Sequence, residues 1–165
     1  MIGGFRWQPI VAAFSLTFLA LIAGHQLYDQ YMVRRSIEQK ILATGLVKRV
    51  DWSQEGELLV YLNPVADLRT AYQVLETSVA RRTTMRVLDQ PSVLLETVYR
   101  QIEPALYEAA ALSNFTSLAE AVERAATAAG LEGYSVQVDE RRIYLSLHHR
   151  GAYLYRIVPR HEQEA

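Results

Sequence analysis

The hydrophobic pattern divides the chain into one long apolar segment and a remainder of short, alternating segments. Residues 9–28 include no Asp, Glu, Lys or Arg. As a helix this segment would rise about 30 Å, the thickness of the hydrocarbon layer of a bilayer. Trp7 precedes it and Tyr28 is its last residue, which places both aromatic rings where they prefer to lie, at the membrane interface. We therefore predict a short tail at 1–8 and a single-pass transmembrane helix at 9–28 that acts as an uncleaved signal-anchor.

A cleaved secretory signal peptide is the alternative, because it also combines a basic start with an apolar core. Each available cleavage site places a bulky residue where a small one is needed, which favours the anchor. Arg6 precedes the segment, whereas Arg34, Arg35 and Lys40 follow it. By the positive-inside rule this bias favours a cytoplasmic globular domain, with an extracytoplasmic domain as the alternative. The chain has no cysteine that would indicate an oxidising compartment.

Small residues form one stripe along the predicted anchor. Ala13, Thr17, Ala20 and Gly24 are spaced four, three and four apart, so they share a helix face. Small side chains at such spacing let two helix backbones approach closely. The stripe predicts association of the anchor with a second copy or with another membrane protein.

Helical spacing continues beyond the anchor. Val33, Ile37 and Ile41 recur on one face between charged residues, and Gly45 supplies a C-terminal signal. We predict a juxtamembrane stalk at 29–45, a globular domain at 46–159 and a polar tail at 160–165.

The domain reads as alternating strands and amphipathic helices in the order ββαβααβββ. Strands are predicted at 46–52, 57–63, 83–89, 134–139, 142–149 and 152–158. The first helix is predicted to start at Asn63-Pro64, the second near Ser92 and the third at the Ser117/Glu120 capping box. Pro104 should kink or split the second helix. The fold class is α+β, with helices on one face of a largely antiparallel sheet.

The last hairpin allows two registers. A three-residue loop at 149–151 pairs His148 with Ala152 and keeps Arg156 off the apolar face. A two-residue loop places Arg156 beside Ile143, which is costly for an unpaired charge. We therefore predict the three-residue loop.

Composition and motifs narrow the function only by exclusion. The 17 basic and 18 acidic residues nearly cancel, so no strong field attracts nucleic acid. The sequence has no glycine-rich phosphate loop, HExxH, CxxC or GxSxG motif. His148 and His149 are adjacent and would point to opposite faces of a strand, which disfavours a shared metal. We expect no cofactor, metal or catalytic residue.

Aromatic and basic residues interleave in the final hairpin, where Tyr144, His148 and Arg156 are the candidate interaction residues. Such a surface can contact a partner protein, although tyrosine is also simply a good strand residue. The expected function is a membrane-anchored, non-catalytic interaction or assembly protein. Its expected partners are the bilayer and either another membrane protein or a second copy. A small membrane-tethered enzyme with a dispersed site is the alternative.

Overall fold

The computed structural model describes residues 17–18, 34–79 and 83–160. The chain divides into two compact units, Met1–Lys40 and Ile41–Ala165. Helix α2 (Arg34–Ala43) begins in the first unit and ends in the second. The second unit holds all the described strands and three further helices.

The predicted single-pass membrane localisation is contradicted. In the described parts of the chain, no helix is both long and apolar enough to cross a bilayer. Helix α4 (Val93–Leu112) is long enough at 20 residues, but it carries Glu96, Arg100, Glu103 and Glu108. The other named helices have 10 to 14 residues, fewer than a span requires. The predicted segment 9–28 lies outside the described residues except for 17–18.

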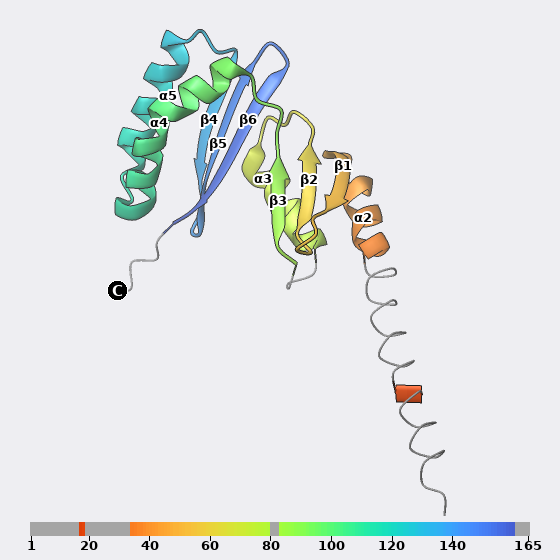
Figure 1. Ribbon diagram of the computed structural model, residues 1–165. Coiled ribbons are helices and arrows are strands. Elements are labelled where there is room, and N and C mark those ends of the chain that lie inside the picture. The colour runs from red at the N-terminus through yellow and green to blue at the C-terminus, as the bar shows by residue number, and fades with distance from the viewer. Residues whose placement is uncertain (1–16, 19–33, 80–82, 161–165) are drawn as a thin grey trace, which may run out of the picture. The chain divides into compact units, whose positions relative to one another are not determined.

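The second unit is α+β, as predicted, but it contains two sheets rather than one (Figure 1). The first sheet has the order β1 (Val47–Trp52), β2 (Leu58–Leu62), β3 (Met85–Leu88). β1 and β2 are antiparallel, whereas β2 and β3 are parallel. A parallel pair needs a crossover connection, and helix α3 (Leu68–Ser78) supplies it.

The second sheet is the antiparallel meander β4 (Gly133–Val138), β5 (Arg142–His149), β6 (Ala152–Pro159). Helix α4 and helix α5 (Phe115–Ala128) pack on one face of it. Ile143, Leu145, Leu147, Leu154 and Val158 meet these helices in one buried cluster. The opposite face lies toward α3, whose Tyr72 ring is 5.9 Å from that of Tyr144. The five central residues of β5 are therefore all buried.

Local sequence signals predicted the order of the helices and strands correctly, but they predicted the first residues of two helices wrongly. The order ββαβααβββ is confirmed, and Ser92 caps α4 by accepting from the Leu95 N–H. The cap of α3 is Asp67 rather than Asn63, and that of α5 is Asn114 rather than Ser117. Pro104 does not split α4, which is continuous through it.

The predicted register of the last hairpin is wrong. β5 and β6 are joined by a two-residue turn, with His149 opposite Ala152 and His148 opposite Tyr153. Arg150 and Gly151 both have positive φ, at 49° and 77°, as a two-residue hairpin turn matched to strand twist requires. The Glu132 carboxylate accepts from the Arg150 N–H at 2.9 Å and supports the strained position.

Candidate interaction groove between β3 and β6

The two sheets meet at a single bridge and then separate. Gln90 and Tyr153 exchange two main-chain hydrogen bonds, of 3.2 and 3.1 Å, as an isolated antiparallel bridge. Beyond this bridge β3 and β6 diverge, as Figure 1 shows. The space between them is a groove of about 790 Å³. We call it the inter-sheet groove, and it is lined by Tyr72, Thr84, Met85, Arg86, Val87, Leu88, Asp89, Arg142, Tyr155, Arg156, Ile157 and Pro159.

A second hollow of about 700 Å³ continues the groove along α3. The two spaces share Tyr72, Thr84, Met85 and Arg142 in their walls. Arg141, in the turn between β4 and β5, lines only the second hollow. The two connected spaces are therefore lined by residues of both β3 and α3.

The β6 wall of the groove presents main-chain groups without strand partners. Residues of a strand direct their N–H and C=O groups alternately to its two edges. Tyr153 bonds outward to Gln90, so Tyr155, Ile157 and Pro159 also face away from β5. The Tyr155 N–H is taken by the Asp89 carboxylate at 2.8 Å. Ile157 presents both an N–H and a C=O, and Pro159 only a C=O.

The β3 wall presents a matching free edge. The Leu58 N–H donates to the Thr84 C=O at 2.9 Å, so Thr84, Arg86 and Leu88 face β2 in the parallel ladder. The main-chain groups of Met85 and Val87 consequently face away from β2, toward the groove. Both side chains are half-buried, which holds this edge in place without covering it.

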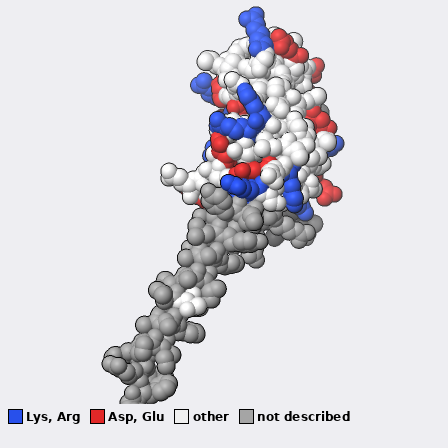
Figure 2. Space-filling view, turned by 90° about the vertical axis from the view of Figure 1, so that its right-hand side faces the viewer, with Lys and Arg blue, Asp and Glu red and all other residues white. Residues whose placement is uncertain are grey.

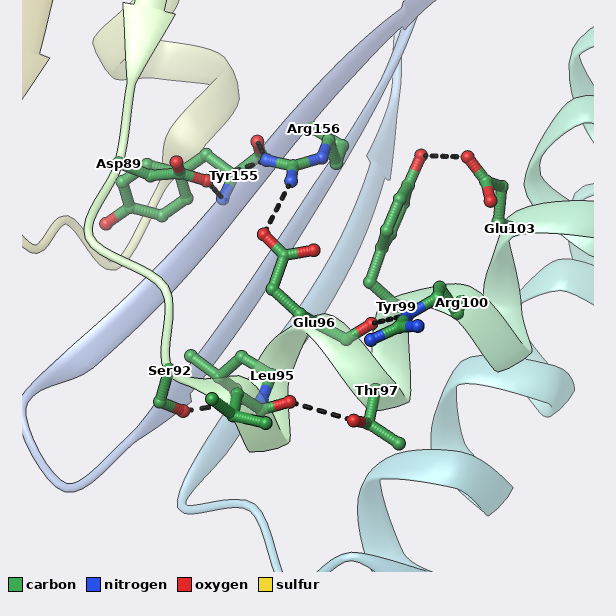
Figure 3. Close-up of polar contacts among 11 residues, drawn as sticks. Asp89, Ser92, Leu95, Glu96, Thr97, Tyr99, Arg100, Glu103, Tyr155 and Arg156 are labelled. Atoms are coloured by element: carbon green, nitrogen blue, oxygen red, sulfur yellow. Dashed lines mark hydrogen bonds and ion pairs between the residues drawn. The ribbon is translucent and has the colours of Figure 1, made fainter.

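A network of charged groups lies at the end of the groove next to the Gln90–Tyr153 bridge, which we call its closed end (Figure 3). The Arg156 Nη1 donates to Asp89 Oδ2 at 2.8 Å and to the Tyr155 C=O at 2.8 Å. Its Nη2 contacts Glu96 Oε1 at 3.3 Å, and its guanidinium lies 4.8 Å from the centre of the Tyr99 ring. Burial and a hydrogen bond to Glu103 raise the pKa of Tyr99 to about 12.

Next to this network, two tyrosine hydroxyls of β6 form hydrogen bonds to β2 and to the segment that follows it. Tyr153 donates to the Leu62 C=O at 2.7 Å in a buried bond. The Tyr155 hydroxyl accepts from the Val65 N–H at 2.7 Å. These contacts join residues about 90 positions apart, so the groove is braced by side chains at its closed end.

The far wall of the groove is a second polar cluster on β5 and α3. Arg142 makes two hydrogen bonds to Glu76, of 3.1 and 2.6 Å, and lies 4.9 Å from the centre of the Tyr72 ring. The bond to Glu76 outweighs burial and raises the pKa of Arg142. Tyr144 donates to Asp139 Oδ2 at 2.7 Å.

The pKa shifts of Tyr144, Asp139 and His148 favour a neutral phenol, an ionised carboxylate and a neutral ring near pH 7. Burial and the bond to Asp139 raise the pKa of Tyr144 to about 12. Burial opposes ionisation of Asp139, but hydrogen bonds from Tyr144 and two backbone N–H groups prevail and lower its pKa. Burial lowers the pKa of His148 and keeps its ring neutral. A phenol with a raised pKa is a poor nucleophile near neutral pH.

The structure separates the three residues that the sequence singled out. Tyr144 and His148 lie on the face of β5 turned away from α4 and α5, where the His148 ring is 5.7 Å from that of Tyr155. Arg156 is opposite Leu145 and reaches α4 on the other face. Of these residues only Arg156 lines the groove. The predicted anchor stripe of Ala13, Ala20 and Gly24 falls outside the described residues, while Thr17 is described as helical.

The groove could not be predicted from the sequence, because its walls come from distant parts of the chain. Asp89 and Arg156 are 67 positions apart. One signal was available in the sequence. A two-residue loop places the charged Arg156 on an apolar strand face, where it needs oppositely charged partners from elsewhere in the chain. No cluster of His, Asp and Glu suited to a metal occurs within the described ranges.

Charge on the surface is mixed rather than concentrated. On the face shown in Figure 2, acidic and basic side chains lie close together on the described part of the chain. No family model, no curated protein and no solved structure matches this chain.

Proposed function

We propose that this chain is a non-catalytic interaction or assembly protein that binds an extended segment of a partner protein in the inter-sheet groove. The observation that carries the proposal is the pair of free strand edges, Met85–Val87 on β3 and Ile157–Pro159 on β6, which face one groove. Free edges bind extended peptides through main-chain hydrogen bonds, and neighbouring pockets select the side chains.

The groove is pre-formed in a way that suits binding. Its closed end is held by the Arg156 network and by the buried hydroxyl bond of Tyr153. A rigid site avoids the entropic cost of ordering its walls when a partner arrives. The alternative of an enzyme built on Tyr144, His148 and Arg156 receives no support from this geometry, because β5 and β6 direct these side chains to opposite faces.

Affinity purification of the full-length chain tests the proposal. Wild type is compared with Val87→Pro, which removes the N–H facing the groove and leaves the ladder to β2 intact. Val136→Pro is the matched control, since Val136 presents an outward N–H on β4, the strand at the far edge of the second sheet. Quantitative mass spectrometry should show partners lost from Val87→Pro and retained by Val136→Pro. Equal recovery of every partner by both variants would refute the groove as the binding site.

A further inference from the structure

We infer that the segment bound in the inter-sheet groove is acidic, that it pairs with the edge of β3, and that its carboxylates lie beside Arg86 and Arg141. This inference rests on the proposed function and specifies the chemistry of the partner. It follows from the charges around the groove and from which of them are already neutralised.

Arginine predominates among the charged residues of the groove. Arg86, Arg141, Arg142 and Arg156 line the two connected spaces, against the carboxylates of Glu76 and Asp89. A lining with four cations and two anions has a formal charge of +2. Charge complementarity of this kind selects partners and accelerates their encounter.

Two of the four arginines already form ion pairs with carboxylates of the same chain. Arg142 is held by Glu76 at 2.6 Å and Arg156 by Asp89 at 2.8 Å, with Glu96 as a further partner. Arg86 and Arg141 are exposed, and neither side chain makes an ion pair with any described residue. The two uncompensated cations are therefore those that a partner's carboxylates can reach.

Main-chain geometry selects β3 as the edge that receives the segment. Met85 and Val87 offer four consecutive outward main-chain groups, two N–H and two C=O. The β6 edge is shorter, since Asp89 already occupies the Tyr155 N–H and Pro159 has no N–H to give. Because the free edge of β3 lies inside a groove, a strand of another protein's sheet cannot easily pair with it. Proteins commonly protect free edges from aggregation by such covering.

A library of random twelve-residue peptides displayed on phage provides the probe. After selection on the full-length chain, one enriched peptide is synthesised with a fluorescent label and its affinity measured by fluorescence polarisation. We expect enriched sequences to be rich in Asp and Glu and to lack proline in the paired stretch. A selected set with no excess of acidic residues would overturn the acidic partner.

Five variants separate main-chain pairing from charge. Val87→Pro should weaken binding at least about fivefold, the equivalent of one lost hydrogen bond. Val87→Ala retains the N–H and should lose less affinity than Val87→Pro, whereas Val136→Pro on β4, outside the groove, should bind within about twofold of wild type. The double variant Arg86→Glu/Arg141→Glu should weaken binding roughly tenfold. Arg124→Glu, an exposed charge reversal on α5, should leave affinity unchanged. Circular dichroism and thermal melts confirm that each variant is folded.

The pattern of effects distinguishes the two proposals. Loss of binding by Val87→Pro without any effect of the charge reversal would overturn the acidic segment and retain the groove. Binding that is insensitive to Val87→Pro would overturn both. Concentration-dependent dimerisation of the chain that Val87→Pro abolishes would assign the groove to a second copy and overturn the acidic partner.

Discussion

Replacement of Asp89 by alanine tests whether one carboxylate holds the two sheets together. Asp89 Oδ2 accepts from the Tyr155 N–H and from Arg156 Nη1, both at 2.8 Å. Asp89 directly follows the last residue of β3 and precedes Gln90, which bridges to the second sheet. Its side chain is only 14% exposed, so water cannot fully replace the lost oxygen.

The expected loss can be worked out from these two bonds. A hydrogen bond to a charged group contributes about 1.5–3 kcal/mol, and the buried Tyr155 N–H has no other acceptor at hand. The ion pair adds about 1 kcal/mol or less, because Arg156 is 28% exposed and still contacts Glu96 and the Tyr155 C=O. Asp89→Ala should therefore lower the free energy of unfolding by about 2–4 kcal/mol.

Asp89→Asn divides this loss into its two parts. The amide oxygen can still accept from the Tyr155 N–H, while the charge opposite Arg156 is gone, so we expect a loss of about 1 kcal/mol. Glu55→Ala, in the exposed turn between β1 and β2, should remain within about 0.5 kcal/mol of wild type. Urea unfolding followed by circular dichroism measures all three. Equal losses for Asp89→Ala and Asp89→Asn would refute the assignment of the larger share to the Tyr155 N–H.

Three further predictions concern the hydroxyl of Tyr153, the pKa values of Tyr99 and Tyr144, and the turn at Gly151. Tyr153→Phe should lower the free energy of unfolding by about 1–2 kcal/mol in urea, because the buried Leu62 C=O loses its 2.7 Å donor; wild-type stability would contradict this. Ultraviolet titration should show Tyr99 and Tyr144 ionising near pH 12. Their folded pKa exceeds the unfolded value of 10, so the stability they contribute is complete below pH 10 and is lost as pH rises toward 12; ionisation of all tyrosines near pH 10 in the folded state would refute it. Gly151→Ala should cost about 1 kcal/mol in a thermal melt, since its φ of 77° suits glycine, and an unchanged melting temperature would contradict a strained turn.

The elements of the domain could be predicted from sequence because their signals are local. Strand alternation and helical stripes identified every strand and helix of the domain in the correct order. Where several caps compete, tertiary packing decides between them. Asp67 caps α3 with bonds of 2.9 and 2.7 Å to Thr70, although Asn63-Pro64 matches the same start signal.

The register of the last hairpin could not be predicted because its cost depends on distant residues. An unpaired Arg156 beside Ile143 would be costly, which is why the sequence predicts the three-residue loop. In the structure Arg156 lies on that face, but Asp89 and Glu96 neutralise it and Tyr99 stacks beneath it. Its partners are 60 and 67 positions away, and the penalty therefore disappears.

The division into two sheets has a physical cause that also explains the groove. Gln90, which follows β3, and Tyr153 of β6 form an antiparallel bridge. In a continued ladder Leu88 would pair with Tyr155, but the main-chain groups of Leu88 face β2. The next outward amide of β6, the Tyr155 N–H, bonds to the Asp89 side chain instead of to main chain. A carboxylate in that place satisfies the amide but offers no strand to follow. The ladder ends there, and the edges beyond it remain open to another chain.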